Sequence, residues 1–91
     1  MANASDFEAV WERVRKYQGE TFRTISGLEF RYTVRGHVVR PDRAQGGISK
    51  SAFSKAWDEW PVIGPGVFGD RVRGSAYVWA ILSEPRISGM R

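Results

Sequence analysis

The chain has 91 residues, of which 42% are hydrophobic and 26% charged, a balance that favours one folded domain and disfavours disorder. It has no Cys, which excludes disulfides and thiolate metal sites and suits a reducing cytoplasm. The net charge of +4 favours a polyanionic partner, and no apolar run approaches the roughly 20 residues of a membrane span, so we expect a cytoplasmic protein without a membrane partner.

The first predicted element is a helix at about residues 5–17. Its apolar side chains recur at helical spacing: Phe7, Val10, Trp11 and Val14. Ser5 followed by Glu8 matches a capping box, in which the serine oxygen accepts a hydrogen bond from an amide of the first turn. Gly19 marks the end of the helix, because glycine is favoured just beyond a helix C-terminus.

Residues 28–35 alternate strictly between apolar and polar side chains, which predicts a strand with one buried and one wet face. The buried face is assigned to Leu28, Phe30, Tyr32 and Val34. The wet face is assigned to Glu29, Arg31, Thr33 and Arg35.

Two flanking strands complete a three-stranded antiparallel meander over residues 21–40. The first flanking strand, 21–25, precedes a tight turn at Ser26-Gly27, where glycine accepts a positive φ. The second, 37–40, ends at Pro41, which cannot donate a ladder hydrogen bond.

The second half of the chain is predicted to be mainly helical. Residues 41–47 form a loop by composition, and a helix follows over 48–60, with Ser49 as its N-cap and Pro61 as its end. Residues 62–69 are an irregular connection rich in Gly and Pro.

Residues 75–84 are apolar nearly all round, so they fit either a buried helix capped by Ser75 or a central strand. Their length and the following Pro85 favour the helix.

The predicted fold class is therefore α+β: an N-terminal helix, the three-stranded antiparallel meander, then two helices joined by an irregular Gly/Pro loop. The helices cover one face of the sheet and leave the other face to solvent. The covered face comprises Phe22, Leu28, Phe30, Tyr32 and Val34.

Residues that carry catalysis are sparse. His37 is the single histidine, and nothing near it in the sequence supplies an orienting partner. No phosphate-loop pattern or spaced set of metal ligands is present in the sequence, so we expect no enzyme activity, no cofactor and no metal. A pocket that joined His37 to Glu84 or Asp70 would favour an enzyme instead.

Positive charge is concentrated in residues 21–50, whose net charge of +4 equals that of the whole chain. The basic residues there are Arg23, Arg31, Arg35, Arg40, Arg43 and Lys50. Arginine binds phosphate through two parallel hydrogen bonds, so this segment predicts a small non-catalytic module that binds DNA or RNA through backbone phosphates.

The predicted strands bring several of these residues to one face. Arg31 and Arg35 share the wet face of their strand, and Arg23 and Arg40 are placed to join them from the flanking strands. Lys50 adds a charge at the start of the second helix, beside Ser49 and Ser51.

Two other interpretations stay open at this point. The arginines also fit a plainly solvated face on which Glu29 pairs with one of them. The protein also fits an interaction or accessory subunit, which binds an acidic protein or a second copy of itself. Most of the Trp residues fit the core, but Trp60 and Tyr77 are candidate exposed anchors for such a partner.

Overall fold

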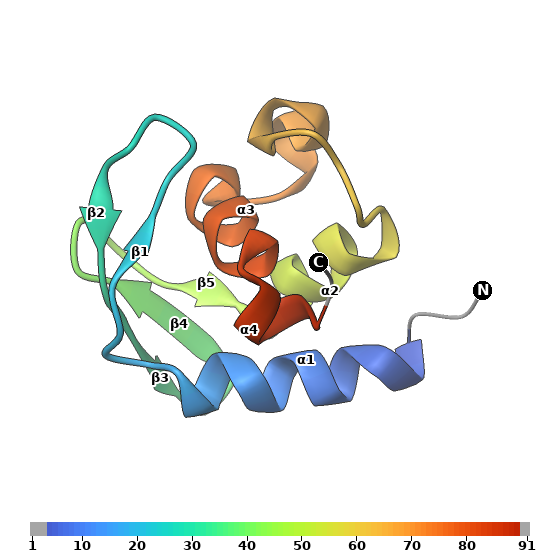
Figure 1. Ribbon diagram of the computed structural model, residues 1–91, viewed down its shortest axis with the longest axis horizontal. Helices are drawn as coiled ribbons and strands as arrows, with labels where there is room; N and C mark the ends of the chain where they lie inside the picture. Colours follow the sequence, from blue (N-terminus) through green and yellow to red (C-terminus); the bar gives the residue numbers. More distant parts are fainter. Residues whose placement is uncertain (1–3, 90–91) are drawn as a thin grey trace.

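A computed structural model describes residues 4–89 and confirms the α+β fold class (Figure 1). An N-terminal helix is followed by two small antiparallel sheets and then by helices. The elements are α1 (Ala4–Lys16), β1 (Phe22–Arg23), β2 (Glu29–Phe30), β3 (Tyr32–Arg35), β4 (Val38–Pro41), β5 (Ile48–Ser49), α2 (Lys50–Asp58), the 3-10 helix η1 (Pro65–Arg71), α3 (Ser75–Ser83) and α4 (Pro85–Ser88).

Helix α1 forms where the apolar spacing predicts it, and it buries the expected side chains: Phe7, Val10, Trp11 and Val14. The side chain of Ser5, the predicted cap, lies outside the described residues. At the other end of the helix, the hydroxyl of Tyr32 donates to the carbonyl oxygen of Val14 at 2.7 Å. This bond satisfies a carbonyl of the last turn and ties α1 to β3.

The antiparallel pairing of neighbouring strands predicted for the meander is confirmed, but the strands are divided between two sheets and do not form one. One sheet is the hairpin β1–β2, and the other has the order β3–β4–β5. The strand predicted over 28–35 is interrupted at Arg31, whose N–H donates to Oδ1 of Asp42 at 3.0 Å. A side-chain oxygen accepts from this N–H, so the chain leaves one sheet and enters the other at that point.

Alternation predicts most of the buried sheet face correctly. Phe22, Phe30 and Tyr32 are buried, and Val34 packs against the core while partly exposed. The prediction that Leu28 is buried is wrong, because its side chain is 41% exposed. It lies in the turn before β2, where strand alternation does not apply.

Strand β5 is missed in the sequence because it has only two residues. Its Ile48, predicted to be helical, is buried as a strand residue. Gly47 precedes it, and a Cβ built there would lie 2.2 Å from Cγ1 of Val38, so only glycine lets this segment lie so close to β4.

In the second half of the chain the predicted helices are present, but they begin and end at other residues than predicted. Ser49 caps α2, as predicted, and its Oγ accepts from the N–H of Ala52 at 3.3 Å. Residues 75–83 are helical, which settles the helix-or-strand question for this segment. The cap of α3 is Gly74, not Ser75, and Pro85 begins α4.

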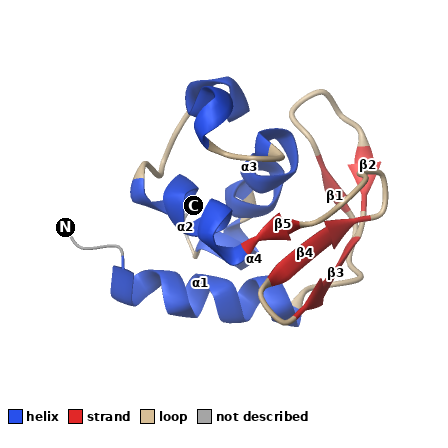
Figure 2. Ribbon diagram, turned by 180° about the vertical axis from the view of Figure 1, so that it is seen from behind, coloured by secondary structure: helices blue, strands red, loops and turns tan. Residues whose placement is uncertain are grey.

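The strands gather at one side of the molecule and the helices at the other (Figure 2). The core between them contains the largest fully buried side chains, which include Trp11, Phe22, Phe30, Tyr32, Phe53 and Phe68. The opposite face of β3–β4–β5 is open to solvent, since Thr33, Arg35 and Arg40 are exposed. In the described part of the chain, no helix is long and apolar enough to cross a membrane.

Candidate nucleic-acid interface

The exposed face of β3–β4–β5 presents arginines in a defined register. Thr33 and Arg35 point outward from β3, because their neighbours Tyr32 and Val34 face the core. Arg40 of β4 lies directly opposite Thr33, and Val38 lies opposite both Arg35 and Ser49. Arg35 and Arg40 are therefore diagonal neighbours on one face.

Arg31 directly precedes β3 and continues the series of outward residues that Arg35 and Thr33 begin. Its Nε donates to the neutral hydroxyl of Thr21 at 3.3 Å, so its positive charge is not compensated there. We define the basic face as Arg31, Arg35 and Arg40. None of these guanidinium groups makes an ion pair with any residue from 4 to 89.

A hollow of about 520 Å³ opens on this face, between the loop of residues 42–47 and Gly19. Its lining includes Arg31, Thr33, Arg40, Asp42, Ala44 and Gly46. The carboxylate of Asp42 is the acidic group of this lining, and it is held at the edge of the sheet by its hydrogen bond from the N–H of Arg31.

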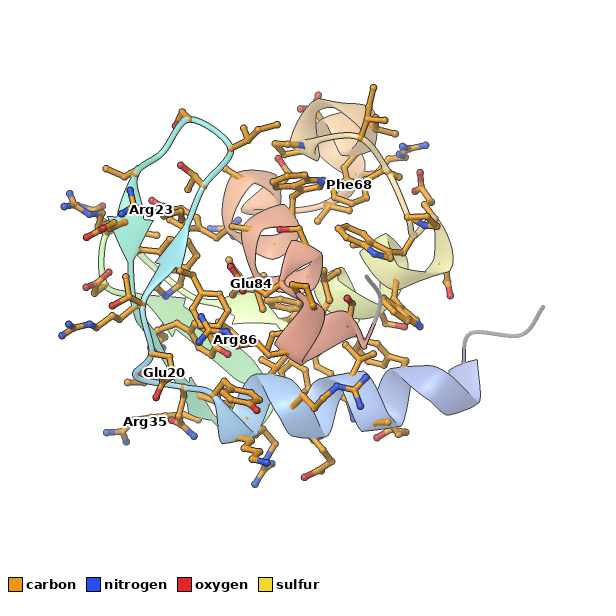
Figure 3. The ribbon with its side chains drawn as sticks, viewed as in Figure 1. Glu20, Arg23, Arg35, Phe68, Glu84 and Arg86 are labelled. Atoms are coloured by element: carbon orange, nitrogen blue, oxygen red, sulfur yellow. The ribbon has the colours of Figure 1, made fainter. Side chains whose placement is uncertain are left out.

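Three of the six basic residues predicted for the site are held elsewhere. Arg23 lies on β1, in the other sheet, and is paired with the carboxylate of Glu29. Arg43 donates through Nε to the carbonyl oxygen of Glu29 at 2.6 Å. Arg23 and Arg35 both project from the strand side of the molecule, but from different sheets (Figure 3).

Lys50 is separated from the basic face as well. Its Nζ lies 3.3 Å from Oε1 of Glu8 and 5.6 Å from the ring centroid of Trp11. At this end of α2 the N–H of Lys50 donates to the carbonyl oxygen of His37, at 2.7 Å. The N–H of Lys50 is therefore satisfied within the fold and is not free to bind phosphate.

Sequence reasoning missed Arg73, which precedes α3. A Cβ built on Gly46 would lie 3.9 Å from Nη2 of Arg73, so this side chain reaches the loop that borders the hollow. Arg73 is exposed, and in the described chain it makes no ion pair. Its position depends on packing between segments almost thirty residues apart, for which no local pattern exists.

His37 borders a separate hollow of about 460 Å³, which it shares with Glu8, Lys50 and serines of α2. The acids that would favour an enzyme, Glu84 and Asp70, do not line it. Across residues 4–89, no three His, Asp or Glu side chains lie close enough to hold a metal ion.

Tyr32 holds the inner side of the sheet beneath the basic face. It is 1% exposed, and its ring centroid lies 5.2 Å from that of Phe22. Burial raises the pKa of its phenol, and the nearby positive charge of Arg86 opposes this effect. Strand β3, which carries Arg35 and begins directly after Arg31, is therefore held on its inner side by a neutral, hydrogen-bonded side chain.

No family model, curated protein or solved structure matches this chain.

Proposed function

We propose that the protein is a small non-catalytic module that binds nucleic acid through the phosphates of its backbone. The observation that supports this function is the basic face itself, in which Arg31, Arg35 and Arg40 project from one open sheet surface without a carboxylate partner in the described chain. A sheet face that served only solubility could pair its arginines with acidic residues, as Arg23 pairs with Glu29. The arginines of the basic face keep their charge available for a phosphate.

The chemistry of the face suits phosphate. A guanidinium group offers a planar set of donors that binds two phosphate oxygens at once. The hydroxyl of Thr33 lies between Arg31 and Arg35 along the strand and supplies a neutral donor. Phosphate contacts of this kind fix position and carry no sequence information, so we expect binding to depend weakly on the nucleotide sequence.

The test measures binding of a short fluorescent DNA duplex by anisotropy at low salt. We expect the wild-type protein to bind with a Kd between about 10⁻⁴ and 10⁻⁶ M at physiological salt and more tightly at low salt. The variant Arg35→Gln/Arg40→Gln keeps the fold, because neither side chain has a partner in the described structure, and it should bind about tenfold more weakly or worse.

A control variant with the same change in charge separates the face from net charge. Arg15→Gln/Lys55→Gln alters two exposed helical residues that make no ion pair within residues 4–89. The proposal requires this control to retain most of the affinity. Equal loss in both variants, or no binding by the wild-type protein, would contradict it.

A second candidate function, self-association, is favoured by an exposed apolar surface. Ile63 is 91% exposed and Ile25 is 59% exposed, and together with Pro65 and Val67 they border a hollow of about 510 Å³. The turn between β1 and β2 and the segment around η1 lie at the same end of the molecule (Figure 1). A Cβ on Gly64 would lie 3.3 Å from Cδ1 of Ile25, so the two segments form one surface.

The occupant that this surface fits is a second copy of the chain. No charged side chain lines the hollow, so two copies, each with a net charge of +4, would meet there without apposing like charges. Sedimentation velocity should show a dimer that grows with concentration and that Ile63→Ser abolishes. A monomer at all concentrations, or a dimer insensitive to Ile63→Ser, would exclude this function.

A further inference from the structure

We infer that the basic face takes double-stranded DNA and not single-stranded nucleic acid. This inference rests on the proposed function and narrows its ligand. It follows from two features of the open sheet surface, namely the absence of an exposed aromatic ring and the spacing of the arginines.

Sheets that bind single strands present aromatic rings on which unstacked bases lie. The aromatic side chains of these sheets are Phe22, Phe30 and Tyr32, and each exposes 2% of its surface or less. Tyr32 borders the hollow on the basic face, but its hydroxyl is directed to Val14 of α1. The ring thus offers no free surface for a base.

The partly exposed aromatic side chains belong to the helices or to the segments that directly follow them, and their rings are engaged within the fold. They are Tyr17, Trp60, Tyr77 and Trp79. Trp60 stacks on Trp57, and Nε1 of Trp79 donates to the carbonyl oxygen of Val62 at 3.2 Å. In the described structure, none of the four lines the hollow on the basic face.

The arginines project from positions on the sheet whose spacing suits a duplex. Arg31 and Arg35 are four residues apart along nearly extended chain, which separates their Cα atoms by about 13 Å. Arg40 lies between them on the neighbouring strand. The major groove of B-form DNA is about 12 Å wide, so the outer two arginines can reach the phosphates along its two edges.

A duplex also presents its phosphates in fixed positions, whereas a single strand must lose conformational freedom to match the array. Among residues 4–89, no aromatic ring on this face stacks on the bases, so nothing offsets the conformational entropy that a single strand loses on binding. Phosphate contacts are then its only favourable contribution. In the A-form duplex of RNA the major groove is narrow, so RNA lacks the wide major groove whose two edges the outer arginines can reach in B-form DNA.

The experiment compares four fluorescent probes of one mixed sequence: the DNA duplex, each of its single strands, and the corresponding RNA duplex. Anisotropy titrations at equal low salt should give the DNA duplex an affinity at least about fivefold above the other probes. Arg35→Gln/Arg40→Gln should remove that preference, and Arg15→Gln/Lys55→Gln should retain it.

The outcomes separate this inference from the proposed function. Equal or tighter binding of a single strand or of the RNA duplex, still lost in Arg35→Gln/Arg40→Gln, would overturn the ligand assignment and leave the proposed function standing. Absence of binding to all four probes would overturn both.

Discussion

The guanidinium group of Arg86 lies over the ring of Phe22, with 4.3 Å between its central carbon and the ring centroid. Its Nη2 donates to the carbonyl oxygen of Thr21 at 2.8 Å. Ion pairs connect it to Glu20 at 3.6 Å and to Glu84 at 3.5 Å (Figure 3). One side chain of α4 therefore joins the C-terminal helix to the first strand.

Replacing Arg86 should lower stability through this junction. Arg86→Lys keeps the charge but loses the planar contact with Phe22 and the donor to Thr21, and we expect a cost of about 1 kcal/mol. Arg86→Ala also loses the aliphatic packing, and we expect about 2 kcal/mol. Urea unfolding measures both, and a wild-type midpoint for Arg86→Ala would contradict this role.

The hydroxyl of Tyr32 should contribute to stability through its bond to the carbonyl oxygen of Val14. Tyr32→Phe leaves that carbonyl without its donor in a buried place, so we expect a loss of about 1–3 kcal/mol in urea unfolding at neutral pH. An unchanged midpoint would mean that the bond contributes nothing.

The same residue predicts how stability depends on alkaline pH. Because burial raises the pKa of Tyr32, the folded state keeps its phenolic proton at a pH where the unfolded chain releases it. The contribution of this proton to the free energy of unfolding is fully present below about pH 10. It declines as the pH rises further, by up to about 1.4 kcal/mol per pH unit. Unfolding measured on either side of pH 10 should show a steeper decline for the wild type than for Tyr32→Phe, and parallel declines would contradict the prediction.

Gly74 should be less replaceable than Gly36, although both have a positive φ, +66 and +58 respectively. A Cβ at Gly74 would lie 2.6 Å from Cδ1 of Ile48, while one at Gly36 would meet nothing within 4 Å. We expect Gly36→Ala to cost about 1 kcal/mol, for the backbone alone, and Gly74→Ala about 3 kcal/mol. Equal thermal or urea midpoints for the two variants would exclude the steric contribution of Ile48.

Asp42 should oppose phosphate binding, because its carboxylate lies in the lining of the hollow with Arg31 and Arg40. Asp42→Asn removes the negative charge and keeps an oxygen that accepts from the N–H of Arg31. We expect DNA affinity to rise about threefold at low salt while the unfolding midpoint stays the same. Weaker binding by a folded Asp42→Asn protein would show that phosphates do not approach this hollow.

Helices α1 and α2 could be predicted because their apolar residues recur at helical spacing, whereas α3 was favoured over a strand by the length of its apolar run and by Pro85. Alternation likewise predicted that Phe30 and Tyr32 are buried. The break at Arg31 could not be predicted, because it depends on a hydrogen bond from the N–H of Arg31 to the carboxylate of Asp42, eleven residues later. Strand β5 has two residues, too few to show a period.

The site was predicted in part, for reasons that differ among its residues. Alternation placed Arg31 and Arg35 on the wet face, and the turn at Gly36 brought Arg40 beside them. The expectation that Glu29 pairs with a nearby arginine is confirmed for Arg23. Arg73 could not be foreseen, since it reaches the loop only through the packing of α3.

The dependence of DNA affinity on salt tests the basic face most directly. Three phosphate contacts predict that log K falls with log salt concentration at a slope of about −2.7, a loss of roughly 40-fold between about 50 and 200 mM. Arg35→Gln/Arg40→Gln should reduce the slope to about −0.9. A slope near zero for the wild type, or one that this variant leaves unchanged, would contradict binding through these arginines.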